Sequence, residues 1–182
     1  MFSRLLNLMY HEHEVILDAA QIASSLENSW ETNVPEYEIG LSGLLDFFKE
    51  YSDRYHHIKE EEILFPALRK TDAPAVISLI DELADHHEQF RGVVEEISND
   101  LTVKNYPAAQ QKLHRYLNDL QDHIAAENEE LFPMADSLFN DDELEKLYHK
   151  CIDQDTALGV AGKQELENFL KNFKLRVDEA AQ

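Results

Sequence analysis

The sequence has few of the residues that build turns and cross-links. Among its 182 residues are 5 glycines, 5 prolines and 1 cysteine. The single cysteine, Cys151, excludes an intramolecular disulfide and leaves too little sulfur for a thiolate metal site. So few glycines and prolines also leave little room for a turn-rich β architecture. These scarcities favour a helical protein without covalent cross-links.

Basic residues and long apolar runs are scarce as well. Lysine and arginine number 16 against 37 aspartates and glutamates, which gives a formal net charge of -21 at pH 7. This charge would repel nucleic acid and anionic membrane surfaces. No stretch approaches the roughly 18 apolar residues of a membrane span, and residues 1–6 lack the apolar core of a secretory leader. We therefore expect a cytoplasmic protein with neither nucleic acid nor membrane as a partner.

Apolar residues at helical spacing outline four long amphipathic segments. With 43% hydrophobic residues, a chain of this length can bury one substantial core. Four such segments joined by short connections predict an all-α, up-and-down four-helix bundle over residues 1–138. The segments cover residues 6–23, 35–67, 76–97 and 113–131, with breaks at 28–35, 72–74 and 99–107.

The remaining residues, 139–182, predict a helical extension that packs on the bundle. Asn140 is suited to cap a short helix, and Gly159 and Gly162 mark a break after it. The last helix is amphipathic and could also join two copies in a homodimer. Its apolar stripe consists of Leu166, Phe169, Leu170, Phe173 and Val177.

One stretch occurs twice, as HHIKEEEILFPA from His56 and as HIAAENEELFPM from His123. A shift of 67 residues aligns His56 with His123 and Glu60 with Glu127, and it repeats the Leu-Phe-Pro tail. In each copy a histidine and a glutamate stand four residues apart, on the same face of a helix. Each copy therefore directs an imidazole and a carboxylate toward one point.

Each copy is preceded by another His-Glu pair, beginning at His13 and at His87. The doubled unit supplies four imidazoles and two carboxylates, a mixed set that suits two borderline transition-metal ions. All six lie in apolar stripes, where an unpaired buried polar group costs roughly 1–3 kcal/mol. The sequence therefore predicts a two-metal site with the ligands His13, His56, Glu60, His87, His123 and Glu127.

The neighbouring pair His57 and Glu61 has the same spacing and competes for this role. The shift of 67 maps His57 to Ile124 and Glu61 to Asn128, so the repeat favours His56 and Glu60. Adjacent residues of an α-helix point about 100° apart, so we expect only one of the two histidines to face the centre.

Five histidines remain outside the predicted ligand set. His87 lies on the apolar stripe of the third segment and His86 does not, so we select His87. For His11, His57 and His86 a solvated side chain is slightly favoured over an outer partner of a ligand or an additional ligand. We interpret His114 and His149 as structural or exposed.

His13, HHIKEEEILFP, His87 and HIAAENEELFP together resemble the hemerythrin-like family of HHE cation-binding domains, over about residues 6–134. The resemblance implies a non-haem di-iron centre, oxo- or hydroxo-bridged, in which Glu60 and Glu127 bridge the ions. Oxygen-carrying members have a second histidine one turn from His87, where this chain has Leu83 and Arg91. The centre then has four histidines and more open coordination, unless a further residue substitutes. The candidates for that residue are His11, His57, His86, Asp153 and Asp155.

The resemblance further implies a small diatomic ligand, such as oxygen or nitric oxide, or peroxide as the partner of the iron. The associated roles are iron or redox stress responses, nitric oxide handling, iron–sulfur cluster repair and peroxide removal, either by binding and sensing or by weak redox catalysis. Two other classes stay open: a non-catalytic iron store or metal sensor, and a bundle with a structural zinc site. Zinc or manganese is compatible with the same ligand types.

Overall fold

The computed structural model describes residues 3–158 and 160–180, without the side chains of residues 156–161 and 176–180. Throughout these residues the regular structure is helical. The first long helix is α1 (Arg4–Ser25), followed by a short 3-10 turn, η1 (Ser29–Glu31). The second is composite, and comprises α2 (Val34–Phe47), the π-helical segments η2 (Phe48–His57) and η3 (Glu60–Leu64), and α3 (Phe65–Arg69).

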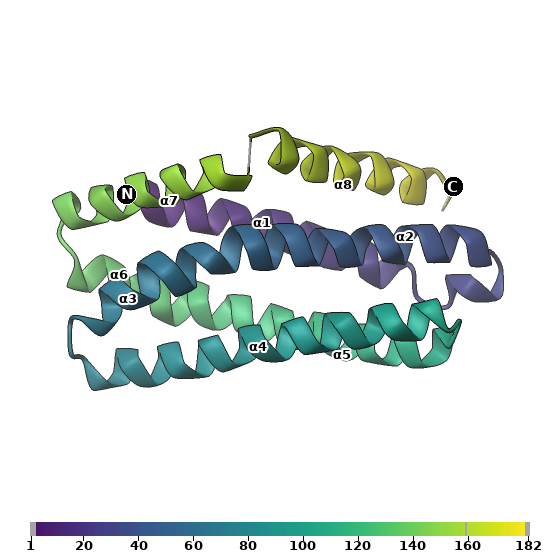
Figure 1. The fold of residues 1–182 in the computed structure, drawn as a ribbon, viewed down its shortest axis with the longest axis horizontal. Helices are drawn as coiled ribbons and strands as arrows, with labels where there is room; N and C mark the ends of the chain where they lie inside the picture. Colours follow the sequence, from purple (N-terminus) through teal and green to yellow (C-terminus); the bar gives the residue numbers. More distant parts are fainter. Residues whose placement is uncertain (1–2, 159, 181–182) are drawn as a thin grey trace.

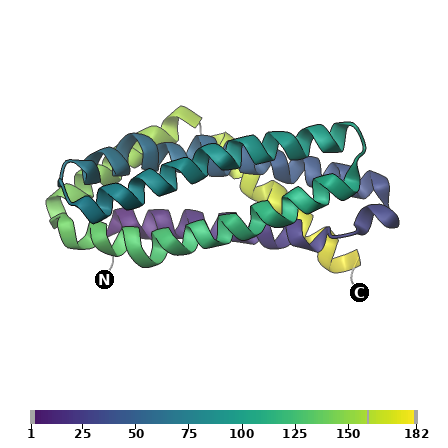
Figure 2. The ribbon, with the colours of Figure 1, turned by 90° about the horizontal axis from the view of Figure 1, so that it is seen from below.

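The third long helix is α4 (Pro74–Thr102). The fourth is composite like the second, and comprises α5 (Tyr106–Ala126), the π-helical segment η4 (Glu127–Leu131) and α6 (Phe132–Leu138). Figure 1 and Figure 2 show the four long helices running alternately up and down the same axis. The predicted four-helix bundle is confirmed. The loop expected at residues 99–107 is shorter, because α4 continues to Thr102.

Both composite helices widen into a π-helical turn at the repeated motif. The N–H of Phe65 donates to the carbonyl of Glu60, five residues back, and Phe132 donates to Glu127 in the same way. A proline follows each of these residues, and proline lacks an N–H and clashes with the carbonyl four residues back in an α-helix. The wider turn accommodates this, and the helices continue beyond Pro66 and Pro133.

The buried apolar residues form two clusters, one on each side of the repeated motif. Along α1, Met9 belongs to one cluster and Ile16 to the other, with His13 between them. Along α4, Leu83 and Phe90 enclose His87 in the same manner. The predicted polar residues therefore form a layer across the bundle with apolar packing above and below.

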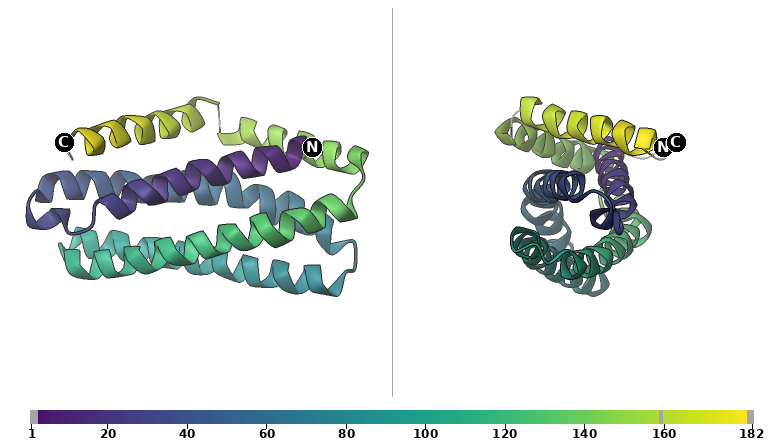
Figure 3. Two further views of the ribbon diagram at one scale, coloured as in Figure 1. Left: turned by 180° about the vertical axis from the view of Figure 1, so that it is seen from behind. Right: turned by 90° about the vertical axis from the view of Figure 1, so that its right-hand side faces the viewer.

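The extension consists of α7 (Asp141–Leu158) and α8 (Val160–Ala180), which lie end to end along the outside of the four-helix bundle (Figure 3). Asn140 caps α7 as expected. Its side-chain oxygen accepts from the N–H of Glu143 at 3.0 Å, and the Glu143 carboxylate accepts from the N–H of Asn140 at 3.0 Å. However, α7 has 18 residues and is therefore longer than the short helix expected there. In addition, α8 begins at Val160, inside the expected break.

The aromatic stripe of α8 packs against two glycines of α2. A methyl group added at Gly40 would lie 2.4 Å from Phe173 Cζ, and one at Gly43 would lie 2.3 Å from Phe169 Cζ. Leu170 and Phe173 are buried in the same contact, whereas the side chain of Val177 lies outside the described residues. Among the described helices, none has the length and apolar character that a membrane crossing requires.

Candidate metal centre

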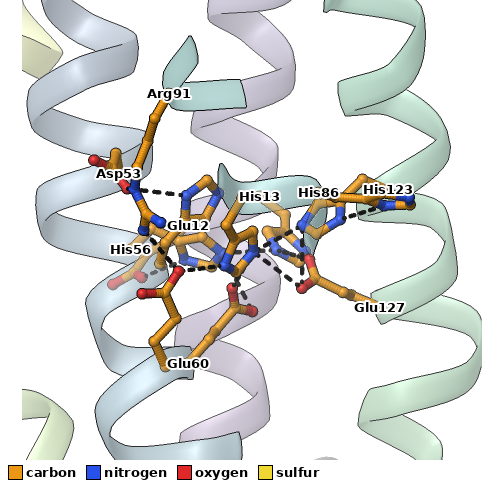
Figure 4. Close-up of polar contacts among 12 residues, drawn as sticks. Glu12, His13, Asp53, His56, Glu60, His86, Arg91, His123 and Glu127 are labelled. Atoms are coloured by element: carbon orange, nitrogen blue, oxygen red, sulfur yellow. Dashed lines mark hydrogen bonds and ion pairs between the residues drawn. The ribbon is translucent and has the colours of Figure 1, made fainter. Parts of the chain in front are cut away.

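The structure brings all six predicted ligands together in the middle of the bundle, and Figure 4 labels five of them, all except His87. Their side chains point inward from all four long helices, and none is more than 1% exposed: His13, His56, Glu60, His87, His123 and Glu127. The burial follows from their positions in the apolar stripes. Whether these six bind metal stays a prediction, but their convergence is a property of the fold.

The four imidazoles form two pairs. His13 Nε2 lies 2.8 Å from His56 Nε2, and His87 Nε2 lies 3.1 Å from His123 Nε2. In all four rings the same nitrogen faces inward. Nitrogen atoms at these separations are close enough for both members of a pair to contact one ion.

Each carboxylate faces both imidazole pairs. The two oxygens of Glu60 lie 3.5 Å from His56 Nε2 and 3.5 Å from His87 Nε2. The two oxygens of Glu127 lie 3.2 Å from His13 Nε2 and 3.3 Å from His123 Nε2. One oxygen of each carboxylate therefore serves each pair, which is the arrangement that two bridging carboxylates require.

The four carboxylate oxygens have no hydrogen-bond donor among the described residues, although both glutamates are fully buried. Burial and the charge of Glu127 raise the pKa of Glu60 well above its ordinary value. Burial also opposes ionisation of Glu127, but His123 and His13 outweigh it and lower the pKa of Glu127. Unpartnered buried carboxylates are costly, and cations bound between these oxygens and the inward nitrogens would remove the cost. The donor set therefore fits two divalent metal ions.

The Nδ1 atom of each imidazole contacts a side chain of another helix. Such outer contacts fix the ring orientation and the tautomer, and they leave Nε2 free to bind metal. The four partners are Asn128 Oδ1 for His13 (2.7 Å), Glu12 Oε2 for His56 (2.9 Å), Glu61 Oε1 for His87 (2.8 Å) and His86 Nδ1 for His123 (3.4 Å).

These outer partners also obey the internal repeat. The shift of 67 that relates the motifs relates Glu61 to Asn128, and each of the two contacts the histidine of another helix. A shift of 74, which maps His13 onto His87, likewise maps Glu12 onto His86. The sequence did not predict Glu12, Glu61 and Asn128 as contacts of the centre. The repeat relates these positions in pairs, but it does not show which helix each side chain contacts.

The expectation that His57 is solvated is wrong. His57 is 3% exposed and stacks on His87, with ring centroids 3.8 Å apart and an interplanar angle of 10°. One ring nitrogen from each of His57, His87 and His123 lies within 4.8 Å of the others. The reason is that η2 is π-helical, so it turns through a smaller angle per residue than an α-helix does. Adjacent histidines therefore both face inward here.

The remaining histidines divide between the centre and the surface. His86 is half-buried and contacts His123, so its interpretation as solvated is also wrong. His11 has a side chain that is 60% exposed and lies 3.6 Å from Glu14, as expected for a surface residue. His114 and His149 are exposed, in agreement with the sequence analysis.

A buried lysine that the sequence did not predict contacts Glu12, the residue that binds His56 Nδ1. Lys59 is 0% exposed, and its ammonium lies 2.5 Å from Glu12 and 2.7 Å from Asp155 of α7. It also lies 3.3 Å from the ring centroid of Tyr55. Burial opposes ionisation of Glu12, but His56 and Lys59 lower the pKa of this carboxyl overall. Asp155 therefore binds Lys59 instead of substituting for a missing ligand.

Leu83 and Arg91 occupy the two positions one turn from His87, where oxygen carriers have a second histidine, and neither is placed as a metal ligand here. Leu83 is 1% exposed and belongs to the apolar core. Arg91 donates from Nε to Asp53 at 2.7 Å and from Nη2 to Glu61 at 2.6 Å. It thus ties α4 to the second long helix beside the stacked rings.

Comparison with known proteins agrees with this geometry. Residues 4–135 match the family described as Hemerythrin HHE cation binding domain. The chain is 31% identical over 109 residues to the iron-sulfur cluster repair protein YtfE of Dickeya chrysanthemi (strain Ech1591), which covers 56% of this chain and 49% of the relative. It is 31% identical over 88 residues to YtfE of Escherichia coli (strain K12 / DH10B), covering 44% and 40%.

The chain thus spans about half the length of the curated relatives it matches, or less. No solved structure matches it significantly. The family match covers most of the chain, from α1 into α6, and contains every residue of the convergent layer. The chain belongs to the hemerythrin HHE cation-binding domain family.

Proposed function

We propose that this protein is a non-haem di-iron protein that meets oxygen, nitric oxide or peroxide, and that it acts in protection against redox stress. The observation that supports the proposal is the position of the two carboxylates between the two imidazole pairs. Glu60 and Glu127 each present one oxygen to each imidazole pair, and none of the described residues donates a hydrogen bond to these four buried oxygens.

In this proposal His13 and His56 would hold one ion and His87 and His123 the other, and both glutamates would contribute to both. A pair of iron ions bound there supplies one-electron and two-electron redox chemistry toward small oxygen and nitrogen species. A site with these ligands binds zinc more tightly than ferrous iron in general. The choice of iron in this proposal therefore rests on family membership and on the supply of metal in the cell.

The chain's own residues orient the donors and keep bulk water out. Phe132 stacks on His13 with ring centroids 5.3 Å apart, and Phe65 stacks on His87 at 5.8 Å. Leu64 and Leu131, one turn beyond the glutamates, are no more than 1% exposed. These apolar walls limit the size of any molecule that reaches the centre, which favours diatomic ligands and peroxide over larger substrates.

The names of the relatives suggest a physiological setting. YtfE proteins carry the name iron-sulfur cluster repair protein, and this chain corresponds to about half of their length or less. We infer that this protein contributes a metal centre to the same kind of repair or stress response. Activities that depend on the rest of those relatives are outside this inference.

Metal analysis and anaerobic spectroscopy test the proposal. We expect about two iron ions per chain after reconstitution with ferrous iron. We also expect the ultraviolet and visible spectrum of the reduced protein to change on addition of oxygen, nitric oxide or peroxide. Iron content of one ion or fewer per chain would reject the di-iron centre. A di-iron protein whose spectrum is unchanged by all three species would be a store or a sensor of metal.

A further inference from the structure

A pocket of about 270 Å³ lies beside the metal centre, between η2 and α4. Its lining residues include His57 and His87, whose rings stack on each other, and Tyr116 of α5. The internal repeat does not produce a second polar wall of this kind, because Ile124 stands where His57 would map. The pocket therefore distinguishes the His87–His123 side of the centre from the His13–His56 side.

Ser52 and His57 both line the pocket. Each has a buried polar atom with no hydrogen-bond partner among the described residues, Ser52 Oγ and His57 Nδ1. Ser52 is 1% exposed and His57 is 3% exposed. The carboxylate beside His57, Asp53, lies 3.5 Å from Nδ1, beyond a good hydrogen bond. Ser52 and His57 are five residues apart, which is one turn of a π-helix, so both side chains occupy the same face of η2.

Ser52 Oγ and His57 Nδ1 determine which hydrogen-bonding groups a molecule bound in this pocket must offer. A serine hydroxyl donates and accepts, and an imidazole nitrogen does one or the other according to its tautomer. A molecule that carries both O–H donors and lone pairs satisfies both positions. Oxygen and nitric oxide carry no donor and satisfy them poorly.

The charges around the pocket balance, although the whole chain has a net charge of -21. Arg91 forms ion pairs with Asp53, which Figure 4 shows, and with Glu61. Arg54 is likewise paired with Glu50. The charged residues of the lining are equal in number for the two signs, so their sum does not favour an ion of either sign. Three basic and three acidic residues line it: Lys49, Arg54, Arg91, Glu50, Asp53 and Glu95.

We propose that this pocket is the port through which a small neutral ligand of the hydrogen peroxide class reaches the His87–His123 side of the centre, with Ser52 and His57 binding it on the way. The inference rests on the proposed function, since it assumes a metal centre that small molecules approach. It goes further by assigning a route, a ligand class and two binding residues.

The first test uses zinc-loaded protein, in which the centre is filled but cannot turn over peroxide. Hydrogen peroxide is titrated while the Ser52 amide and the His57 ring are followed by nuclear magnetic resonance. We expect saturable shifts at both residues in the wild type. Val94 lines the pocket, so Val94→Phe should abolish the shifts. Val93 is on the same helix but lines a different pocket, so Val93→Phe is the matched control and should retain them.

The second test uses iron-loaded protein and stopped-flow absorbance. Ser52→Ala removes one hydrogen bond, so it should slow the reaction with peroxide by about fivefold. It should leave both the iron content and the association rate of nitric oxide unchanged. If Val94→Phe does not fold, this conservative variant still decides the question.

The possible outcomes separate the two proposals. Absent or non-saturable shifts in the zinc-loaded wild type would overturn the port, and so would equal shifts in Val94→Phe. An equal loss of the peroxide and nitric oxide rates in Ser52→Ala would overturn the ligand class. If the iron-loaded wild type reacts with neither species, the proposed function fails, while the zinc-loaded titration still reports on the pocket.

Discussion

Lys59 and Asp155 form an ion pair of 2.7 Å that joins the second long helix of the bundle to α7 of the extension. Lys59 is fully buried, and its second partner, Glu12, holds Nδ1 of His56. Three consecutive contacts therefore connect the extension to an inward-facing imidazole. Since residues 136–182 lie outside the family match, this connection is a feature of the chain beyond the shared domain.

Removing the lysine should cost more stability than removing its outer partner. Lys59→Met leaves the carboxylates of Glu12 and Asp155 without their cation, and breaking a buried pair in this way costs about 3–5 kcal/mol of unfolding free energy. Asp155→Asn leaves Lys59 paired with Glu12 and should cost about 1–2 kcal/mol. Urea unfolding measures both effects. The exposed pair of Asp18 and Lys174 provides the control, and Asp18→Asn should change stability by less than about 0.5 kcal/mol.

The inward-facing histidines should differ from His57 in their effect on metal content. His56→Ala deletes a nitrogen that points at both Glu60 and His13, so we expect the iron content to fall from about two ions per chain toward one. His57→Ala leaves four imidazoles and two carboxylates in place, and the content should stay near two. Elemental analysis after identical reconstitution compares the variants, with exposed His11→Ala as control. Loss of iron in His57→Ala but not in His56→Ala would move the site to the other histidine.

The carboxylate behind His87 should tune metal affinity without being a ligand. Glu61 accepts from His87 and from Arg91, so Glu61→Ala frees the ring to rotate and to change tautomer. Loss of such an outer partner typically lowers metal affinity by about 10-fold to 100-fold. Competition with a chromophoric chelator measures the change. The adjacent, exposed Glu62 is the control, and equal affinities of Glu61→Ala and Glu62→Ala would contradict the role of Glu61.

Metal-free protein should lose stability in mild acid because of His56. Burial and the neighbouring His13 lower the pKa of His56 to about 4, from an ordinary value of 6.5. Between these values the unfolded chain binds a proton and the folded chain does not, so the contribution to stability is present above pH 6.5 and is lost as the pH falls to about 4. The loss is on the order of 3 kcal/mol at roughly 1.4 kcal/mol per unit.

Urea unfolding of metal-free wild type and His56→Gln at pH 7 and pH 4.5 measures this component. The glutamine does not titrate, so the variant should show the smaller loss of stability between the two pH values. Equal losses would mean that His56 is already protonated in the folded protein, or that it is accessible to water.

The sequence determined the helices and the inward-facing donors because both are local consequences of spacing. A histidine and a glutamate four residues apart share a helix face, and the apolar stripe fixes which face is buried. The positions of these residues therefore predicted that they would meet in the structure: His13, His56, Glu60, His87, His123 and Glu127. The duplication predicted that the two halves of the bundle contribute equivalent donors.

Tertiary structure decided everything that depends on contacts between helices or on departures from α geometry. The π-helical turns of η2 brought His57 inward beside His56, against the rotation per residue that an α-helix imposes. The partners of the outer nitrogens, such as Glu61 for His87, lie on other helices, so no local spacing encodes them. The burial of Lys59 required Glu12 and Asp155 to arrive from two separate elements, since a lysine charge stays buried only where carboxylates meet it.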